Sequence, residues 1–173
     1  QEQPNPPAGH VPDANYVVVG PRYFETMQIP LRAGRPFDEH DTAGGLPVVI
    51  VNEELARTQW PGQNAIGRRI KLGGPSDTIW PWLTVVGVSG SAMTQGPQGG
   101  VRAEVYVPYQ QFPWLLVPEH LVVRASPGTE PARLTRSIVA EIARLDRDLP
   151  AADIKTMEEV AAMPMGQQRM VMA

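Results

Sequence analysis

The spacing of Gly62 and Gly67, with four residues between them, could form a phosphate-binding loop. Such a loop carries a lysine directly after its second glycine, followed by a serine or threonine that binds magnesium. Arg68 and Arg69 occupy those two positions here. The segment also leads from an expected helix into an expected strand, whereas a phosphate loop leads from a strand into a helix. We therefore do not expect nucleotide binding at this loop.

A nucleophilic serine is a second possibility, because Ser89 lies between Gly87 and Gly90. In a nucleophile elbow each glycine lies two residues from the serine, so the second glycine is one position early here. A triad would also need an acidic residue and a histidine downstream. His120 is the only histidine after Ser89, and no aspartate lies between them. We therefore do not expect acyl hydrolysis.

A metal site is a third possibility, at the polar run Asp38-Glu39-His40-Asp41. Successive residues cannot all point at one ion, and the other two histidines, His10 and His120, are remote in sequence. We expect a solvated acidic loop and isolated histidines. The absence of cysteine excludes thiol catalysis and disulfides.

Two pairs of carboxylates, Glu53-Glu54 and Glu158-Glu159, could serve acid–base chemistry. Both pairs open expected helices, where the helix dipole favours negative charge without any catalytic role. The sequence thus predicts no catalytic residue, no metal site and no bound cofactor.

Two aromatic stretches, 79–82 and 112–116, hold three of the four tryptophans next to prolines. One interpretation is that Trp82 and Phe112 close the core from loops. The alternative is a partner surface, because tryptophan at an exposed position is typical of binding hot spots. The candidate partner contacts are Trp80, Trp114, Leu115 and Leu116.

The elements that must position these residues centre on residues 48–73. The β-branched run 48–51 predicts a strand buried on both faces. Asn52 is expected to cap a helix that directs Leu55, Ala56 and Trp60 inward and ends at Pro61. After a loop, the alternation at 69–72 predicts a strand with one exposed face.

The same patterns predict the remaining elements, with a turn at 31–37 and a central strand at 83–88. Other strands are expected at 16–19, 104–107, 121–124 and 153–155, and helices at 22–28, at 126–146 and from 157. The helix from 157 follows a capping box at 156–159. The net charge is −3 with scattered basic residues, so a nucleic-acid partner is not expected. No apolar run approaches the roughly 20 residues that span a bilayer, and the apolar, unterminated ending is typical of an excised piece of a longer protein.

Five stretches, taken together and in this order, resemble the extracytoplasmic domain of MacB-like and FtsX-like ABC transporter permeases. The resemblance is greatest to the long permeases abundant in acidobacteria, and it covers roughly residues 15–173. The stretches are NYVVVGPRYFETMQIPLRAGRPF (15–37), PVVIVNEELARTQWPGQNAIGRRIKLGG (47–74), WLTVVGV (82–88), EVYVPYQQ (104–111) and LVVRAS (121–126).

The resemblance implies an α+β fold in three parts. Residues 1–14 would be an extended or disordered N-terminal segment. Residues 15–100 would form a small mixed α/β subdomain inserted into a porter-like one. Residues 101–173 would form a porter-like ββαβα segment, half of a ferredoxin-like fold, leading toward a transmembrane helix. The other porter half would lie upstream, which would leave the strand at 121–124 with an edge open to a second copy.

The resemblance implies a periplasmic, non-catalytic domain that transmits conformational change and docks partners or substrate. ATP would be hydrolysed by a separate cytoplasmic ABC ATPase. The other partners would be the transmembrane helices of the parent permease and a periplasmic adaptor or second permease copy. Two alternatives stay open. An enzyme would need a perturbed ionisable pair in a cleft, and a stand-alone ligand-binding module would need an apolar pocket lined by Trp80, Trp82 and Trp114.

Overall fold

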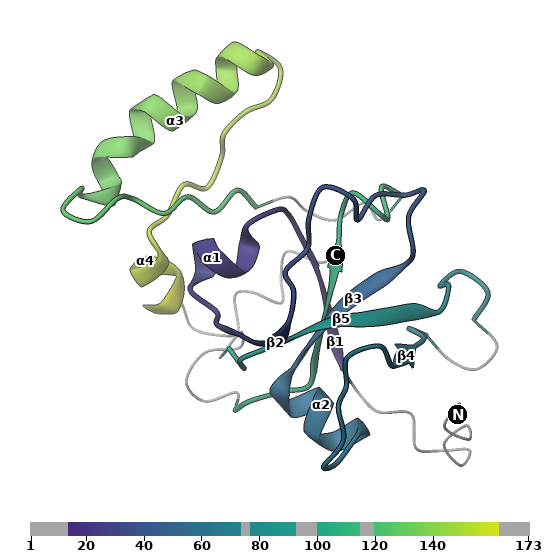
Figure 1. The fold of residues 1–173 in the computed structure, drawn as a ribbon. Coiled ribbons are helices and arrows are strands. Elements are labelled where there is room, and N and C mark those ends of the chain that lie inside the picture. The colour runs from purple at the N-terminus through teal and green to yellow at the C-terminus, as the bar shows by residue number, and fades with distance from the viewer. Residues whose placement is uncertain (1–13, 74–76, 93–99, 115–119, 163–173) are drawn as a thin grey trace. The chain divides into compact units, whose positions relative to one another are not determined.

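The computed structural model describes residues 14–73, 77–92, 100–114 and 120–162 (Figure 1). The chain divides into two compact units, Gln1–His120 and Leu121–Ala173. The sequence predicted a division after residue 100. The structure instead keeps the strand at 104–108 in the sheet of the first unit. Each unit is therefore described by itself.

The first unit contains a mixed sheet of six strands in the order β1-β6-β3-β5-β2, with β4 paired to β5. The β1–β6 and β3–β5 pairs are parallel, and the other pairs are antiparallel. The strands are β1 (Asn15–Val19), β2 (Leu31–Gly34), β3 (Val48–Asn52), β4 (Arg69–Ile70), β5 (Leu83–Ser89) and β6 (Glu104–Pro108). The predicted mixed α/β class is confirmed, and β5 is central as expected.

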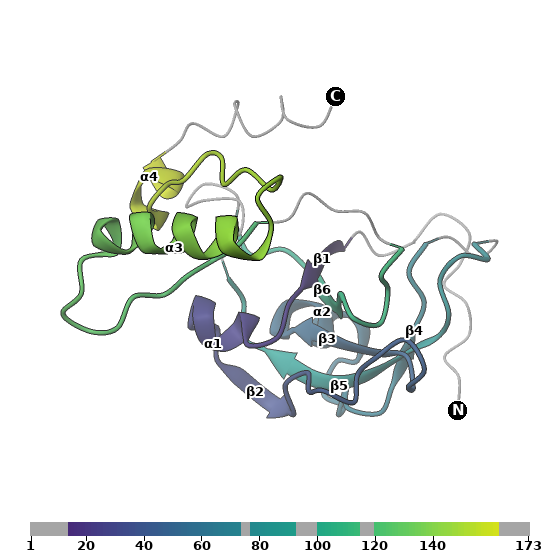
Figure 2. The ribbon, with the colours of Figure 1, turned by 90° about the horizontal axis from the view of Figure 1, so that it is seen from above.

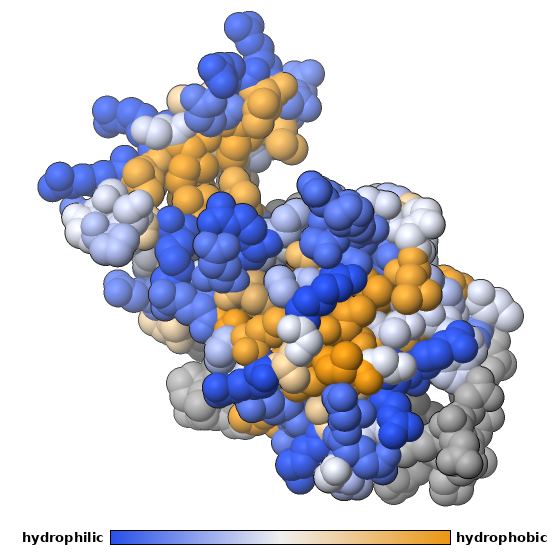
Figure 3. Space-filling model, viewed as in Figure 1, coloured by the Kyte–Doolittle hydropathy of each residue, from blue (hydrophilic) through white to orange (hydrophobic). Residues whose placement is uncertain are grey.

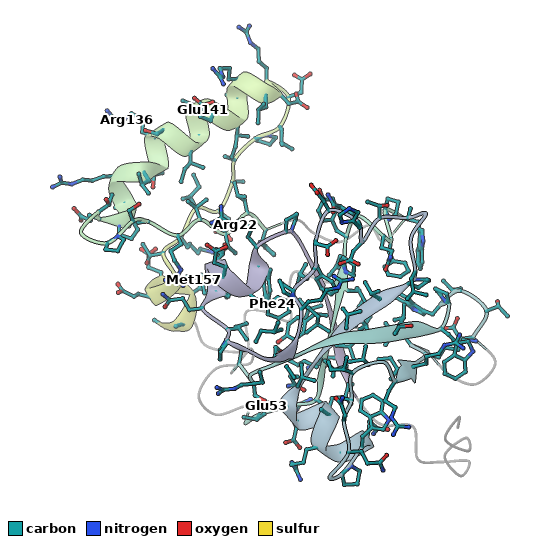
Figure 4. All side chains as sticks on the ribbon, in the orientation of Figure 1. Arg22, Phe24, Glu53, Arg136, Glu141 and Met157 are labelled. Atoms are coloured by element: carbon teal, nitrogen blue, oxygen red, sulfur yellow. The ribbon has the colours of Figure 1, made fainter. Side chains whose placement is uncertain are left out.

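Two helices cover opposite faces of this sheet, as Figures 1 and 2 show. Helix α1 (Tyr23–Met27) directs Phe24 toward the strands (Figure 4), where it packs with Ile50 and Tyr106. Helix α2 (Glu53–Gln59) packs Leu55 against the other face. Successive strand residues point to opposite faces, and both faces of this sheet are covered, so most residues of the inner strands β3 and β6 are apolar. Every residue of β3 and β6 is accordingly buried.

Asn52 joins the two halves of this packing, because it ends β3 and caps α2. Its side-chain oxygen accepts a hydrogen bond from the backbone N–H of Leu55 at 2.9 Å, as the sequence predicted, and another from the backbone N–H of Glu104 at 3.1 Å. Its amide nitrogen donates to the carbonyl of Arg102 at 2.6 Å. The fully buried amide is therefore satisfied by helix and sheet together.

The segment expected to be a turn at 31–37 begins instead with β2, so that prediction is wrong. Gly34 suggested a turn, but it lies in strand β2, which pairs with β5, and it has a φ of 76° there. A Cβ at Gly34 would collide with the carbonyl of Val86, so only glycine permits this approach. The strand expected at 69–72 is present but covers only Arg69–Ile70.

The second unit contains two helices within its described residues, α3 (Pro131–Leu145) and α4 (Met157–Ala162). The capping box before α4 is confirmed: the backbone N–H of Thr156 donates to the Glu159 carboxylate at 2.6 Å, and the backbone N–H of Glu159 donates to the Thr156 hydroxyl at 3.2 Å. The strands predicted at 121–124 and 153–155 are absent from the described residues. A strand exists by pairing with a neighbour, and neither segment has one in this part of the chain.

Candidate functional site

Four aromatic side chains of the first unit form a connected group at its surface, which we call the aromatic cluster: Tyr16, Trp80, Phe112 and Trp114. The ring centroid of Trp80 lies 5.8 Å from that of Tyr16, 5.2 Å from that of Phe112 and 5.4 Å from that of Trp114. These separations are typical of edge-to-face and tilted aromatic contacts. Trp80 is thus the centre of the group.

Burial divides the aromatic cluster into a floor and an exposed rim. Phe112 is buried in the core, and Trp80 is half-buried against it. Tyr16 and Trp114 are 51% and 49% exposed. The cluster therefore presents aromatic surface to solvent while resting on the sheet core, the arrangement of an anchored contact site.

Three separate parts of the chain bring these rings together. Tyr16 lies on the edge strand β1, and Trp80 lies in the loop before β5. The Asp77 carboxylate fixes that loop, because it accepts the backbone N–H of Ile79 at 2.7 Å and of Trp80 at 3.4 Å. Such a side-chain turn holds the backbone that carries the Trp80 ring.

Phe112 and Trp114 follow a turn after β6, and the buried side chain of Gln111 fixes this turn. Its oxygen accepts the backbone N–H of Val48 at 2.8 Å, and its nitrogen donates to the carbonyl of Leu46 at 2.7 Å. The amide thereby ties the turn to the start of β3. The hydrogen bonds of Asp77 and Gln111 therefore fix the two loops that carry Trp80 and Trp114.

The structure brings together Trp80 and Trp114 of the four predicted contact residues. Leu115 and Leu116 lie outside the described residues. Tyr16 was missed as a site residue, although its place in an alternating strand could have indicated an outward ring. Trp82, 45% exposed, stacks instead under the Arg69 guanidinium at 5.3 Å, so the prediction that it closes the core is wrong.

The predicted solvated acidic loop at 38–41 is wrong for Asp41, which is 4% exposed. The Arg35 guanidinium donates to both Asp41 carboxylate oxygens, at 2.7 and 2.8 Å, and the backbone N–H of Asp38 donates at 2.9 Å. Burial alone would raise the pKa of Asp41, but these hydrogen bonds and the Arg35 charge hold it below its ordinary value. The missed signal was an arginine six residues upstream.

A second buried carboxylate, Glu104, also escaped sequence reasoning. It is 1% exposed, and the hydroxyl of the fully buried Tyr106 donates to it at 2.5 Å. Burial, with the neighbouring Glu104, raises the pKa of Tyr106 well above its ordinary range. The Tyr106 side chain lies on the sheet face that α1 covers and packs with Phe24, so this pair is part of the core.

The other candidates for chemistry occupy positions that explain them structurally. Ser89 is fully buried at the end of β5, where no substrate could reach its hydroxyl. Gly62 and Gly67 both have positive φ angles, of 69° and 80°, as turn residues do. Across the described ranges, no group of three or more histidine or acidic side chains is placed to hold a metal ion.

The second unit carries a shallow apolar groove of about 320 Å³ along α3. Figure 3 shows apolar side chains gathered along this helix, whereas Arg136 and Glu141 project from it in Figure 4. The apolar residues that line the groove are Leu121, Val123, Ile138, Ile142 and Leu145. Helix α3 therefore has an apolar face.

The family model for the MacB-like periplasmic core domain matches residues 6–141 of this chain. The chain belongs to this family. Domains of this family are parts of transporter permeases, and the family is not a known enzyme family. They lie on the periplasmic side of the inner membrane. Among helices in the described residues, none is both long and apolar enough to cross a membrane.

Known proteins agree with this MacB-like assignment. The macrolide export ATP-binding/permease protein MacB 1/2 of Paracoccus denitrificans (strain Pd 1222) is 32% identical over 91 residues. That match covers 53% of this chain and 13% of the relative, so the chain spans a small part of that protein.

Two solved structures share the MacB-like fold. The periplasmic region of MacB from Actinobacillus actinomycetemcomitans has a TM-score of 0.53 and 19% identity, over 76% of this chain and 56% of that one. The extracellular domain of the noncanonic ABC-type transporter YknZ from Gram-positive bacteria has a TM-score of 0.50 and 21% identity, over 78% and 64%. At these identities the likeness concerns the fold alone.

Proposed function

We propose that this domain is a non-catalytic part of an ABC permease, which transmits conformational change and docks a periplasmic partner through the aromatic cluster. ATP is hydrolysed by a separate cytoplasmic ATPase, and the transmembrane helices of the parent permease carry the motion. The observation that carries the proposal is the aromatic cluster on a tightly packed MacB-like body: Tyr16 and Trp114 are half-exposed, yet both contact Trp80, which rests on the buried Phe112.

The packing of the first unit suits the transmission of motion. Two of its inner strands, β3 and β6, are buried along their whole length, and its two cores lie on opposite faces of one sheet. A body packed in this way moves as a unit, because interiors at crystal-like density deform little. A force applied at one edge of the sheet therefore reaches the aromatic cluster without being absorbed by local rearrangement.

Transmission is tested in the parent permease by labelling this domain at a single site. The sequence has no cysteine, so Thr58→Cys on the exposed side of α2 provides one label position within the domain. On an otherwise cysteine-free permease in vesicles, a fluorophore there should change its emission when ATP is added. The same label on the isolated domain should not respond. A permease that hydrolyses ATP while its label stays silent would refute transmission.

Docking is tested by substituting the two tryptophans of the aromatic cluster. The double variant Trp80→Ala/Trp114→Ala should lower transport by the parent permease, while basal ATP hydrolysis in detergent stays unchanged. Trp82→Ala is the matched control, because this tryptophan is about as exposed as Trp114 but stacks on Arg69. Equal losses in both variants, or none in the double variant, would remove the cluster from the proposal.

A further inference from the structure

Three rings of the aromatic cluster form a short ladder. Tyr16, Trp80 and Trp114 follow one another at centroid distances of 5.8 and 5.4 Å, with Phe112 beneath Trp80 and Trp114. Two of these rings are half-exposed. Neighbouring aromatic rings of this kind are the lining on which proline-rich, extended segments dock in peptide-recognition domains. Proline fits because its backbone is already extended and loses little entropy on binding.

The chain itself supplies a segment of that chemistry next to the cluster. Residues 1–13 contain Pro4, Pro6, Pro7 and Pro12. Pro4 and Pro7 are three residues apart, the repeat of a polyproline II helix, and would therefore lie on one edge of it. This segment lies outside the described residues and directly precedes Ala14, the first residue that the structure describes.

The junction lies close to the rings. Residues 1–13 are followed by Ala14, which packs against the core that contains Phe112, and Tyr16 is two residues further on. The seven residues 7–13, which separate Pro7 from Ala14, reach about 22 Å at about 3.1 Å per residue. That reach exceeds the ring separations in the cluster. A tether this short gives an effective concentration in the millimolar range, so even weak stacking would be populated.

We infer that the proline-rich N-terminal segment of this chain docks on the Tyr16–Trp80–Trp114 ladder of its own first unit. Pro4 and Pro7 stack on the half-exposed rings. The segment then covers the surface on which a partner would dock, so a partner must displace it. This inference concerns the isolated chain and stands whether or not the domain transmits motion in a permease.

The four tryptophans allow a direct test, because each gives one indole N–H signal in an NMR spectrum. Trp60 is buried under α2 and Trp82 stacks on Arg69, so these two report on the fold away from the ladder. The test variant replaces Pro4, Pro6 and Pro7 with serine in the full chain. Single tryptophan-to-phenylalanine variants assign the four signals. The matched control replaces the neighbours Glu2, Gln3 and Asn5 with serine.

The inference expects the Trp80 and Trp114 signals to move by more than their line width in the proline variant, at any protein concentration. The Trp60 and Trp82 signals should stay in place, and the control variant should match the parent chain. A synthetic peptide of residues 1–13, added at millimolar concentration to the proline variant, should return the two signals toward their original positions.

Three results would overturn the inference. If no signal moves, the segment does not contact the ladder. If the shift grows with protein concentration, a second copy supplies the segment, and docking within one chain is wrong. If all four signals move, the fold has changed and the peptide decides: failure to restore Trp80 and Trp114 overturns the inference, and their selective restoration supports it.

Discussion

The first unit buries its apolar side chains inside itself, whereas the second unit leaves them at its own surface. In the first unit, two separate cores occupy the two faces of one sheet. In the second unit, no described residue is buried, and Leu145 on the apolar face of α3 is 84% exposed. Both units have well-patterned elements, so the contrast comes from what each element finds to pack against.

This contrast shows that local pattern and stability are separate properties. A helix with one apolar face contributes stability only when that face is covered, because propensity alone leaves short helices marginal in water. Helix α2 meets the sheet, whereas the groove along α3 is open within the described residues. We therefore expect the first unit to unfold cooperatively on its own, and the second to contribute little to that transition.

The contrast between the units is tested most directly by replacing one large apolar side chain in each unit with alanine. Trp60→Ala removes a ring that is 4% exposed in the core under α2. It should lower the free energy of unfolding by about 3–5 kcal/mol, the range for large buried aromatics. Urea denaturation followed by circular dichroism measures it.

The matched control is Leu145→Ala in the second unit. Because this side chain is already exposed, its loss should change the free energy of unfolding by less than about 0.5 kcal/mol. Equal effects of the two substitutions would show that both units share one folding transition. An unchanged denaturation curve for Trp60→Ala would show that Trp60 is not part of the core.

Polar burial distinguishes the units as well. Tyr106→Phe removes the hydroxyl that donates to the buried Glu104. It should lower the free energy of unfolding by about 1–3 kcal/mol, because the buried carboxyl group of Glu104 loses a donor that water cannot replace. Tyr109→Phe, at a tyrosine that is 49% exposed, should have no measurable effect. If both variants lose the same stability, the loss does not come from the hydrogen bond between Tyr106 and Glu104.

The same pair gives a pH signature. The pKa of Tyr106 is raised in the folded state, so its stabilising contribution is complete below the ordinary tyrosine pKa of about 10. As the pH rises above that value, the unfolded chain loses the proton and the folded chain keeps it, so stability falls. Tyr106→Phe should make this fall less steep. Thermal melts between about pH 9 and 11, on both sides of the ordinary tyrosine pKa, would detect the change.

Asp41→Asn should destabilise the first unit by less than Tyr106→Phe. The substitution weakens a bidentate contact with Arg35, which is 43% exposed and can regain water. We expect about 1 kcal/mol, the low end for hydrogen-bonded charges. Since the pKa of Asp41 is lowered by folding, the parent chain should lose this contribution as the pH falls below about 4, and Asp41→Asn should not. Equal acid sensitivity of the two proteins would refute the assignment.

Sequence patterns predicted the elements whose causes are local. The β-branched run of β3, the Asn52 cap and the Thr156–Glu159 capping box each depend on neighbours within a few residues. The errors concern distant partners. Gly34 resembles a turn residue until β5 is known to lie against it, and 121–124 resembles a strand although no described strand pairs with it.

The candidate site shows the same limit. The two aromatic stretches were recognisable because tryptophan and proline gather in loops. The contact between these stretches and Tyr16 could not be recognised, because it depends on β1 pairing with β6 across about ninety positions of the chain. The Arg35–Asp41 contact was equally hidden, since a charged run carries no sign of which carboxylate is buried.

The last prediction concerns the second unit alone. Thr156→Ala removes the hydroxyl that accepts the Glu159 backbone N–H at the start of α4. A lost cap costs about 1 kcal/mol of helix stability. If α4 is stabilised mainly by its cap, amide exchange at Met157–Ala162 should quicken while the urea midpoint of the first unit stays fixed. Thr58→Ala in α2 is the control, and it should leave α4 unchanged. A shared loss of stability in Thr156→Ala would mean that α4 and the first sheet unfold together, so the contrast between the units would be one of exposure alone.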